Sequence, residues 1–299
     1  MSRQSGLPLV SVLIVAYNGQ DYLGRCLDSL AQSDYPCFET IVVDNASTDS
    51  SVAVATQHHL RPTVVRSAEN LGFAGGNNLG LREAKGEIIV LLNQDAHVRP
   101  DWLSCLIDGM LEDPRIGIAG CKLFDPDERT IQHAGGVVHP NALTNHLGAG
   151  EADAGQHDGI RDVDYVTGAA LAIRRDVIES CGALDTGYFP AYFEELDLCQ
   201  RVRRAGFRVV YIPRSVAVHH ESSSTQKFSP SFFYFYHKNR LRFVLKNYSI
   251  GQIVGGFLPH ELRWLLGHCP PNQVRPLARA YLHNAVFLPR TLICRWKRQ

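Results

Sequence analysis

Three clusters of polar residues each follow an apolar run in the first hundred positions: Tyr17-Asn18, Asp44-Asn45 and Asn93-Gln94-Asp95. A carboxylate placed in this way can bind a divalent cation or accept a hydrogen bond from a ring N–H, and the amides can bond hydroxyl groups. Sites that hold a metal and a phosphate usually show two acids, whereas the third cluster offers only Asp95. The question is therefore what a single carboxylate can hold there.

The runs before these clusters indicate which elements must position them. Three continuous, β-branched apolar runs predict strands covered on both faces: residues 9–15, 40–44 and 87–93. Helical patterns lie between and after them, over residues 20–33, after Ser47 and Thr48, and over residues 75–86. This alternation predicts an α/β fold with a parallel, doubly wound sheet, in which ligands bind beyond the carboxyl ends of the strands. The three clusters are expected to meet at that edge.

One cluster also has a simpler interpretation. The stretch DNAS at 44–47 is typical of a turn and helix N-cap, because Asp, Asn and Ser side chains accept hydrogen bonds from the free N–H groups of a first helical turn. Three such clusters converging on one sheet edge favour a ligand site over three separate caps.

Several nucleotide-binding and hydrolytic classes are disfavoured by motifs that the chain lacks. It has no G-x-x-x-x-G-K-[ST] segment and no G-x-S-x-G elbow, and the glycines of NLGFAGGNNLG (70–80) follow the third element with the wrong spacing for a dinucleotide fingerprint. A sugar-1-phosphate nucleotidyltransferase would need a glycine-rich segment after its first strand, where this chain reads AYNGQDY. A catalytically silent binding protein stays open as an alternative.

Composition predicts a folded protein with an uneven charge distribution. The 299 residues are 45% hydrophobic, and the eight cysteines form no C-x-x-C pair, so we expect reduced thiols. No secretory signal pattern begins the chain, and no uninterrupted apolar run approaches the roughly 20 residues that span a bilayer, so we expect a cytoplasmic location. Residues 1–221 carry 18 Lys and Arg against 29 Asp and Glu, whereas residues 222–299 carry 12 against Glu261 alone.

An ordered set of motifs over about 240 residues resembles the family-2 glycosyltransferases of the GT-A fold, and specifically their bacterial rhamnosyltransferase-type branch. The motifs are SVLIVAYNG (11–19), VVDNASTDSS (42–51), ENLGFAGGNNLG (69–80), LLNQD (91–95), VTGAALAIRR (166–175), YFEELDLCQRVRRAG (192–206), VAVHHESSST (216–225) and YHKNRLRFVLKN (236–247). The resemblance implies a GT-A type, doubly wound, mostly parallel sheet over residues 1–247. Its nucleotide-binding half would cover about 1–120 and its acceptor-binding half about 121–247, followed by a basic, amphipathic helical tail over 248–299.

The resemblance also implies how a nucleotide-sugar donor binds, with dTDP- and UDP-linked sugars favoured. Asp44 would accept the imide N–H of a uracil-like base, a charge-assisted bond, while Ala16 and Tyr17 flank the ring. NQD resembles a variant of the family's D-x-D motif, in which only the last acid needs charge: Asp95 would bind Mg²⁺ or Mn²⁺, and Asn93 would face the ribose and sugar. Two further donor residues and one further metal ligand follow from the motifs: Asn77, Asn78 and His219.

The catalytic base is expected in EELD, residues 194–197. Acids at a helix start favour the positive end of the helix dipole, which would explain Glu194 and Glu195 without catalysis. The family places its base at the second acid, here Glu195 where an Asp is usual, so Glu194 and Asp197 stay as alternatives. Thr167, Gly168 and Glu194 would line the acceptor side, giving an inverting transfer to a hydroxyl of a glycan or lipid-linked acceptor in the synthesis of cell-surface polysaccharide.

The C-terminal region combines aromatic, apolar and basic residues. No recognised nucleic-acid motif accompanies the basic residues of 231–247, so we expect no nucleic-acid partner. The charge step and the apolar residues Phe257, Leu258, Trp264, Leu265 and Leu266 predict docking at the inner face of the cytoplasmic membrane. Packing on the catalytic domain or a homodimer contact are the competing interpretations.

Overall fold

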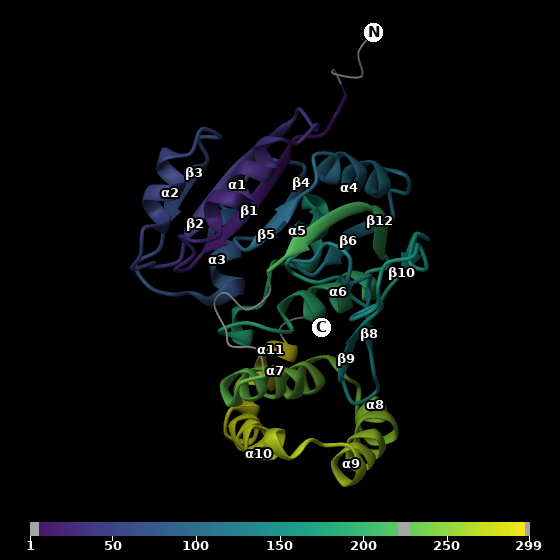
Figure 1. Ribbon diagram of the computed structural model, residues 1–299. Helices are drawn as coiled ribbons and strands as arrows, with labels where there is room; N and C mark the ends of the chain where they lie inside the picture. Colours follow the sequence, from purple (N-terminus) through teal and green to yellow (C-terminus); the bar gives the residue numbers. More distant parts are fainter. Residues whose placement is uncertain (1–5, 221–227, 297–299) are drawn as a thin grey trace.

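The computed structural model describes residues 6–220 and 228–296 (Figure 1). The part of the motif at 216–225 that follows His220 lies outside these residues. The first half consists of β1 (Val10–Ala16), α1 (Leu23–Ala31), β2 (Phe38–Asp44), α2 (Ser51–Gln57), β3 (Thr63–Arg66), α3 (Gly72–Leu81), β4 (Ile88–Asn93), β5 (Ala96–Val98) and α4 (Trp102–Leu111). The three predicted strands and three predicted helices are confirmed by β1, β2, β4 and α1, α2, α3, and the sequence patterns missed the short strand β3.

The second half adds strands of two to twelve residues and two α-helices. These elements are β6 (Ile116–Phe124), β7 (Ile131–His133), β8 (Gly136–Val138), β9 (Thr144–His146), β10 (Arg161–Asp162), β11 (Ala170–Arg174), α5 (Arg175–Cys181), the 3₁₀ turn η2 (Thr186–Tyr188), α6 (Glu194–Arg204) and β12 (Arg208–His219). The main sheet has the order β10-β12-β6-β11-β4-β1-β2-β3. It is parallel across β4-β1-β2-β3, and β11 runs antiparallel to both β4 and β6. The predicted α/β, GT-A type architecture is confirmed.

Each face of the sheet has its own apolar core because side chains alternate along a strand. Val10, Val12 and Ile14 of β1 pack with residues of α1 and α4, whereas Leu13 packs with residues of α3, α5 and α6 on the other face. Both faces are therefore covered by helices. Polar side chains that follow the strands are left at the sheet edge, where a ligand can reach them.

Helices form the C-terminal end of the chain, as predicted (Figure 1). They are α7 (Pro230–Asn247), α8 (Ile250–Gln252), the π-helical turn η3 (Ile253–Phe257), α9 (Leu258–Gly267), α10 (Pro271–Val286) and α11 (Leu288–Trp296). Among the described residues, no helix combines the length and apolar character needed to span a membrane. The boundary at residue 247 stays a prediction, and α7, which lies before it, packs against both α10 and α11.

Candidate functional site

The register of the sheet brings the predicted donor residues to one edge. Ala16 lies opposite Asp44 in the β1–β2 ladder, and the neighbouring Val15 lies opposite Asn93 in the β1–β4 ladder. Asp44 is buried, and one carboxylate oxygen accepts a hydrogen bond from the backbone N–H of Ser47 at 3.0 Å. The turn predicted for DNAS is thus present, and it fixes the Asp44 carboxylate at the sheet edge.

Gln94, to which the sequence patterns assigned no role, holds the backbone at Tyr17. Its amide oxygen accepts the Tyr17 N–H at 3.0 Å, and its amide nitrogen donates to the Tyr17 carbonyl at 3.2 Å. A Cβ on Gly19 would lie 1.9 Å from that amide oxygen, so glycine is required for this close approach. The Tyr17 side chain stays exposed, in keeping with a ring that flanks a ligand.

The structure brings together Asp95 and His219, the two residues that the motifs predict as metal ligands. The His219 Nε2 atom lies 3.3 Å from a carboxylate oxygen of Asp95, and its Nδ1 lies 2.7 Å from the amide oxygen of Gln132. Because that oxygen only accepts hydrogen bonds, Nδ1 carries the proton and Nε2 presents its lone pair toward Asp95. Cis ligands of an octahedral Mg²⁺ lie about 3 Å apart, given metal–oxygen distances of about 2.1 Å, so this donor set fits a divalent cation.

Two neighbours complete this end of the site. The Asn93 amide nitrogen lies 3.2 Å from His219 Nε2, so Asn93 borders the metal pair as well as the sheet edge. His220 points elsewhere, with its Nε2 3.4 Å from a guanidinium nitrogen of Arg25. Of the two adjacent histidines, His219 is therefore the one directed at Asp95.

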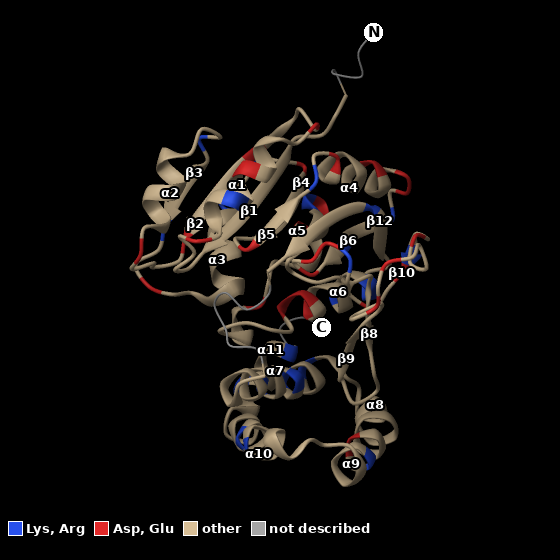
Figure 2. Cartoon of the chain, viewed as in Figure 1, with Lys and Arg blue, Asp and Glu red and all other residues tan. Residues whose placement is uncertain are grey.

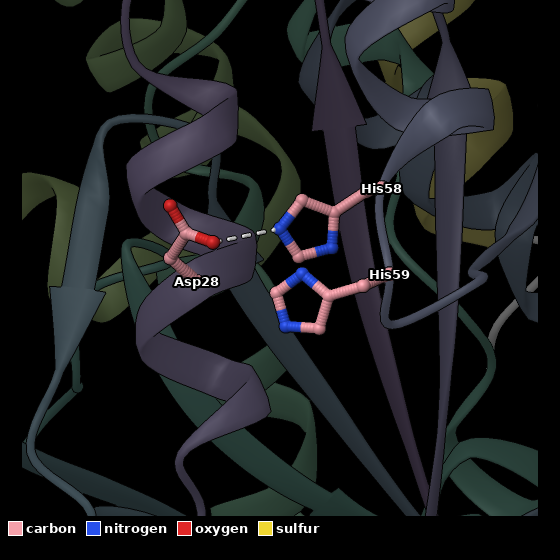
Figure 3. A group of neighbouring side chains, drawn as sticks. All are labelled: Asp28, His58 and His59. Carbon is pink, nitrogen blue, oxygen red and sulfur yellow. Dashed lines mark hydrogen bonds and ion pairs between the residues drawn. The ribbon is translucent and has the colours of Figure 1, made fainter.

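A second group of possible ligands lies elsewhere on the surface (Figure 3). Within the described ranges, Asp28, His58 and His59 are the one set of three or more potential ligand residues whose ligand atoms all lie within 4.8 Å of one another. His58 Nδ1 accepts a hydrogen bond from the Leu60 N–H, so its proton resides on Nε2, which donates to Asp28 at 3.0 Å. This tautomer presents an N–H where a metal needs a lone pair, and the contact is an ordinary histidine–carboxylate bond.

A continuous chain of contacts runs from the metal pair to the predicted base. The Asn93 backbone N–H donates to the Ala169 carbonyl at 2.9 Å, because the segment before β11 passes beside the end of β4. The next residue back, Gly168, donates its backbone N–H to the Glu195 carboxylate. The predicted acceptor segment and the predicted base are thus in direct contact.

Gly168 has a packing reason to be glycine. A Cβ at this position would lie 2.8 Å from the ring of Phe73, so the aromatic ring of α3 already occupies the space that a side chain would need. Thr167 precedes it and is partly exposed. The absence of a side chain at Gly168 therefore serves the contact with α3 and leaves its N–H directed at Glu195.

The adjacent carboxyl groups of Glu194 and Glu195 occupy different environments. Glu194 is 1% exposed, and no group in the described part of the chain gives either of its oxygens a hydrogen bond of good geometry. Burial, followed by the nearby Glu195 charge, raises the pKa of Glu194 well above its ordinary range. Burial also raises the pKa of Glu195, but backbone N–H groups that bond its charged form offset part of this effect. Burial therefore favours the neutral form at Glu194, whereas the backbone N–H groups favour the charged form at Glu195.

Asp197, the second alternative for the base, is fully buried and engaged in structural contacts. It accepts hydrogen bonds from Tyr188, Arg201 and Asn247 and forms an ion pair with Lys246 at 2.6 Å. Burial acts to raise the pKa of Asp197, but the charges of its cationic partners outweigh burial and lower it. These contacts make it a link between α6 and α7.

Helix α7 also holds the loop that leads into the catalytic segment. The Asn239 amide nitrogen donates to the carbonyls of Ala191 and Tyr192 at 2.8 and 3.0 Å, and Lys238 donates to the Phe189 carbonyl. Figure 2 shows the acidic start of α6 facing the basic residues of α7. The helical end of the chain therefore positions Glu194 and Glu195.

The remaining predicted donor residues, Asn77 and Asn78, lie within α3. The Asn77 amide donates to the Phe73 carbonyl at 2.9 Å. The Asn78 amide donates to the Leu184 carbonyl at 2.8 Å and accepts the Leu184 N–H at 3.2 Å. Their role along the donor stays a prediction, and their visible function is to fix α3 and the segment before η2.

Comparison with known proteins agrees with this arrangement. The family described as "Glycosyl transferase family 2" matches residues 11–182. An uncharacterised protein, y4gI of Sinorhizobium fredii, is 33% identical over 73% of this chain, which spans 25% of that relative's length. The N-acetylglucosaminyl-diphospho-decaprenol L-rhamnosyltransferase of Mycobacterium tuberculosis is 26% identical over 86% of this chain and 89% of the relative.

A solved structure confirms the fold. GalNAc-T7 with UDP, GalNAc and Mn²⁺ superposes with a TM-score of 0.65 and 17% identity, over 81% of this chain and 48% of that one. The family match covers more than half of the chain, and its range includes the three strand-end clusters and the segment at 166–175. The chain belongs to glycosyl transferase family 2 and is a glycosyltransferase of the GT-A fold.

Proposed function

We propose that this enzyme is an inverting, metal-dependent glycosyltransferase that moves a sugar from a nucleoside-diphosphate donor to a hydroxyl of a glycan or lipid-linked acceptor. The observation that carries the proposal is the chain of contacts from His219 and Asp95, through Asn93, to Gly168 and Glu195. It joins a cation-binding pair to a carboxylate base along one sheet edge. A nucleotide-sugar transfer needs both groups on opposite sides of the reacting carbon.

The donor is expected to be dTDP- or UDP-linked, with a rhamnose-like sugar as the first candidate. The Asp44 carboxylate and the solvent-exposed ring of Tyr17 suit a nucleotide base that carries an imide N–H. The M. tuberculosis relative is named as a rhamnosyltransferase acting on a diphospho-decaprenol acceptor, which supports this sugar and a lipid-linked acceptor here. Synthesis of cell-surface polysaccharide is the process in which such a reaction belongs.

Mg²⁺ or Mn²⁺ would be held by Asp95 and His219, with Gln132 fixing the histidine tautomer. The bound cation would supply positive charge for the diphosphate leaving group. Manganese in the GalNAc-T7 structure supports a divalent metal in this fold. Asn93, beside His219, has an amide suited to a donor hydroxyl.

Glu195 is the proposed base. Its carboxylate takes the proton of the acceptor hydroxyl as the oxygen attacks the anomeric carbon from the face opposite the leaving group, which inverts the configuration. The Gly168 N–H orients this carboxylate. Both carboxyl oxygens of Glu194 are buried, so the acceptor role expected for it requires a rearrangement that exposes them. Thr167, next to Gly168, adds a hydroxyl on the acceptor side.

The proposed setting is the cytoplasm at the inner face of the membrane, with contact through the C-terminal helices. A homodimer is the alternative use of the same helices. A catalytically silent protein that only binds nucleotide sugars is the alternative for the site as a whole, since a raised pKa and a donor pocket do not by themselves require turnover. A sugar-1-phosphate nucleotidyltransferase ranks below both because the glycine-rich segment is absent after the first strand.

The test combines binding and turnover in one panel of nucleotide sugars. With Mn²⁺ present, a bound donor at a hundredfold excess over its dissociation constant should add about 2.7 kcal/mol to the free energy of unfolding. The donors that stabilise the protein are then assayed for hydrolysis and for transfer, and the anomeric configuration of the product is read by NMR. Stabilisation without hydrolysis or transfer would support the silent binding protein, and a retained anomeric configuration would contradict the inverting mechanism.

A further inference from the structure

The helical end of the chain carries a row of exposed apolar side chains that nothing in the catalytic site uses. The row lies on the continuous helical segment α8–η3–α9, where exposure reaches 77% at Ile250 and 80% at Leu266. Its members are Ile250, Val254, Leu258, Leu262, Leu265 and Leu266. We call this row the apolar face. Large apolar patches of this kind mark protein or membrane contacts on soluble proteins.

The π-helical turn aligns the apolar face. Its members recur mainly every four residues, and in an α-helix each such step advances about 40° beyond a full turn, so a long row would wind around the helix. The π turn at Ile253–Phe257 is wider than an α turn and takes back part of this drift. Phe257 and Glu261 alternate with these positions along the segment and are buried against the protein. The segment therefore has one buried side and one apolar side that faces solvent.

Helix α10 carries exposed apolar side chains as well. Figure 1 shows α9 and α10 together at the end of the molecule opposite the N-terminus. Val274, Leu282 and Val286 are exposed on α10, and Leu292 and Ile293 are exposed on α11. Exposed apolar side chains are therefore not confined to the segment α8–η3–α9.

The exposed charges at this end are all positive among the residues that the structure describes. The single acid of residues 222–299, Glu261, is buried in a two-pronged ion pair with Arg240 at 2.6 and 2.7 Å. The exposed charged residues of α9 to α11 are Arg263, Arg275, Arg279 and Arg290. A surface that combines apolar side chains with cations and no exposed acid is complementary to anionic lipid head groups.

We propose that the apolar face, with these four arginines, binds the head-group region of an anionic lipid bilayer. Two copies of the same surface placed against each other would bring arginines to an interface that has no acid to pair with them, so a lipid surface fits the charge better than a second copy. Helix α9 is joined to α7 through the Arg240–Glu261 ion pair, and residues of α7 hold the loop before Glu194. Binding would thus bring the proposed acceptor side of the site to the membrane. The inference does not depend on the proposed reaction.

The structure changes which residues of the C-terminal helices are available to contact a membrane. Of the apolar residues singled out in the sequence, Leu258, Leu265 and Leu266 are exposed, whereas Phe257 is buried and Trp264 is partly buried against α7. Apolar insertion should therefore contribute to binding beside electrostatic attraction, and part of the binding should survive high salt.

The experiment is co-sedimentation of the full chain with phosphatidylcholine vesicles that contain or lack phosphatidylglycerol, at low and high salt. We expect binding to the anionic vesicles, with a fraction retained at high salt. The double variant Leu262→Gln/Leu266→Gln should weaken this binding by about tenfold or more, since each removes an exposed side chain able to enter the interface. Leu111→Gln on α4 is the matched control, exposed but distant in the sequence, and should bind as the parent does.

Two further measurements make the outcome decisive. Arg263→Gln/Arg275→Gln should reduce binding to anionic vesicles at low salt and leave the fraction that resists salt. Thermal unfolding of each variant checks that the fold is intact. The proposal is overturned if the parent chain stays in the supernatant with anionic vesicles at low salt, or if the leucine double variant sediments like the parent. Sedimentation velocity that shows a dimer broken by this variant, without vesicle binding, would assign the surface to a second copy.

Discussion

Replacing Glu194 by glutamine should separate the roles of the two adjacent acids. Glutamine keeps the shape of a protonated glutamate and cannot ionise. Because Glu194 is buried without a partner, which raises its pKa, the folded protein favours its neutral form. Glu194→Gln should therefore reduce transfer far less than Glu195→Gln, for which loss of a general base predicts a decrease of roughly 10²- to 10⁴-fold with donor binding retained.

The same variant should change how stability depends on pH. Between the ordinary pKa of 4.5 and the raised pKa of the folded state, the folded protein holds one proton more at Glu194 than the unfolded chain does. The stability that this group contributes is present at low pH and is lost as pH rises, with a slope of at most about 1.4 kcal/mol per pH unit. Glu194→Gln removes the part of the slope that comes from Glu194, so its stability relative to the parent should grow with pH.

The assay is urea unfolding of both proteins at a series of pH values from 5 to 8, with initial transfer rates measured on the same preparations. Glu179→Gln on α5, an exposed site, is the matched control and should leave the parental pH slope unchanged. Stability curves of the parent and Glu194→Gln that run parallel would refute the assignment of the proton to Glu194. A large loss of transfer in Glu194→Gln, with Glu195→Gln active, would show that the catalytic base is Glu194 and not Glu195.

Three other perturbations follow from the contacts. Gln132→Leu should weaken Mn²⁺ binding by about 10- to 100-fold, because His219 loses the acceptor that fixes its tautomer; unchanged metal titration by calorimetry would contradict this. Gly19→Ala should lower the free energy of unfolding by about 1–3 kcal/mol through the clash with Gln94, and a parental value in urea unfolding would argue against it. Glu261→Gln leaves a buried arginine unpaired and should cost about 3–5 kcal/mol in the same assay; a loss below about 1 kcal/mol would show that water reaches the pair.

Local sequence patterns were sufficient to predict β1, β2 and β4. The apolar runs at 9–15, 40–44 and 87–93 are continuous and rich in β-branched residues, and helical patterns lie between them. The local sequence is therefore enough to identify these runs as strands and to give their order along the chain. The strand ends then follow, since residues such as Asp44 and Asp95 stand directly after the runs. Short elements carry too little pattern, and β3, with four residues, was missed.

The supporting residues of the site could not be read from the sequence because they come from distant segments. Gln132 approaches His219 across 87 positions, and Gln94 approaches Tyr17 across 77. A glutamine has no local signature that separates these positions from a solvated surface. The glycine in AYNGQDY offered one weak signal, because a close approach of another group is a common reason for glycine.

The count of charged residues was a poor guide to the surface charge of α7. Arg240, Arg242 and Lys246 contribute to the excess of positive charge after residue 222, yet their charges are neutralised inside the protein by Glu261, Asp185 and Asp197.

A buried, paired cation exerts little field outside the protein, so the net charge of a segment overstates the potential at its surface. Among the residues that the structure describes, the exposed arginines of α9 to α11 are the charges that a membrane would meet. With about 1 kcal/mol for each cation near an anionic surface, four of them give weak and salt-sensitive attraction. The apolar face must then supply the remaining affinity, and for this reason the leucine variants, more than any change of charge, decide whether the helical end binds lipid.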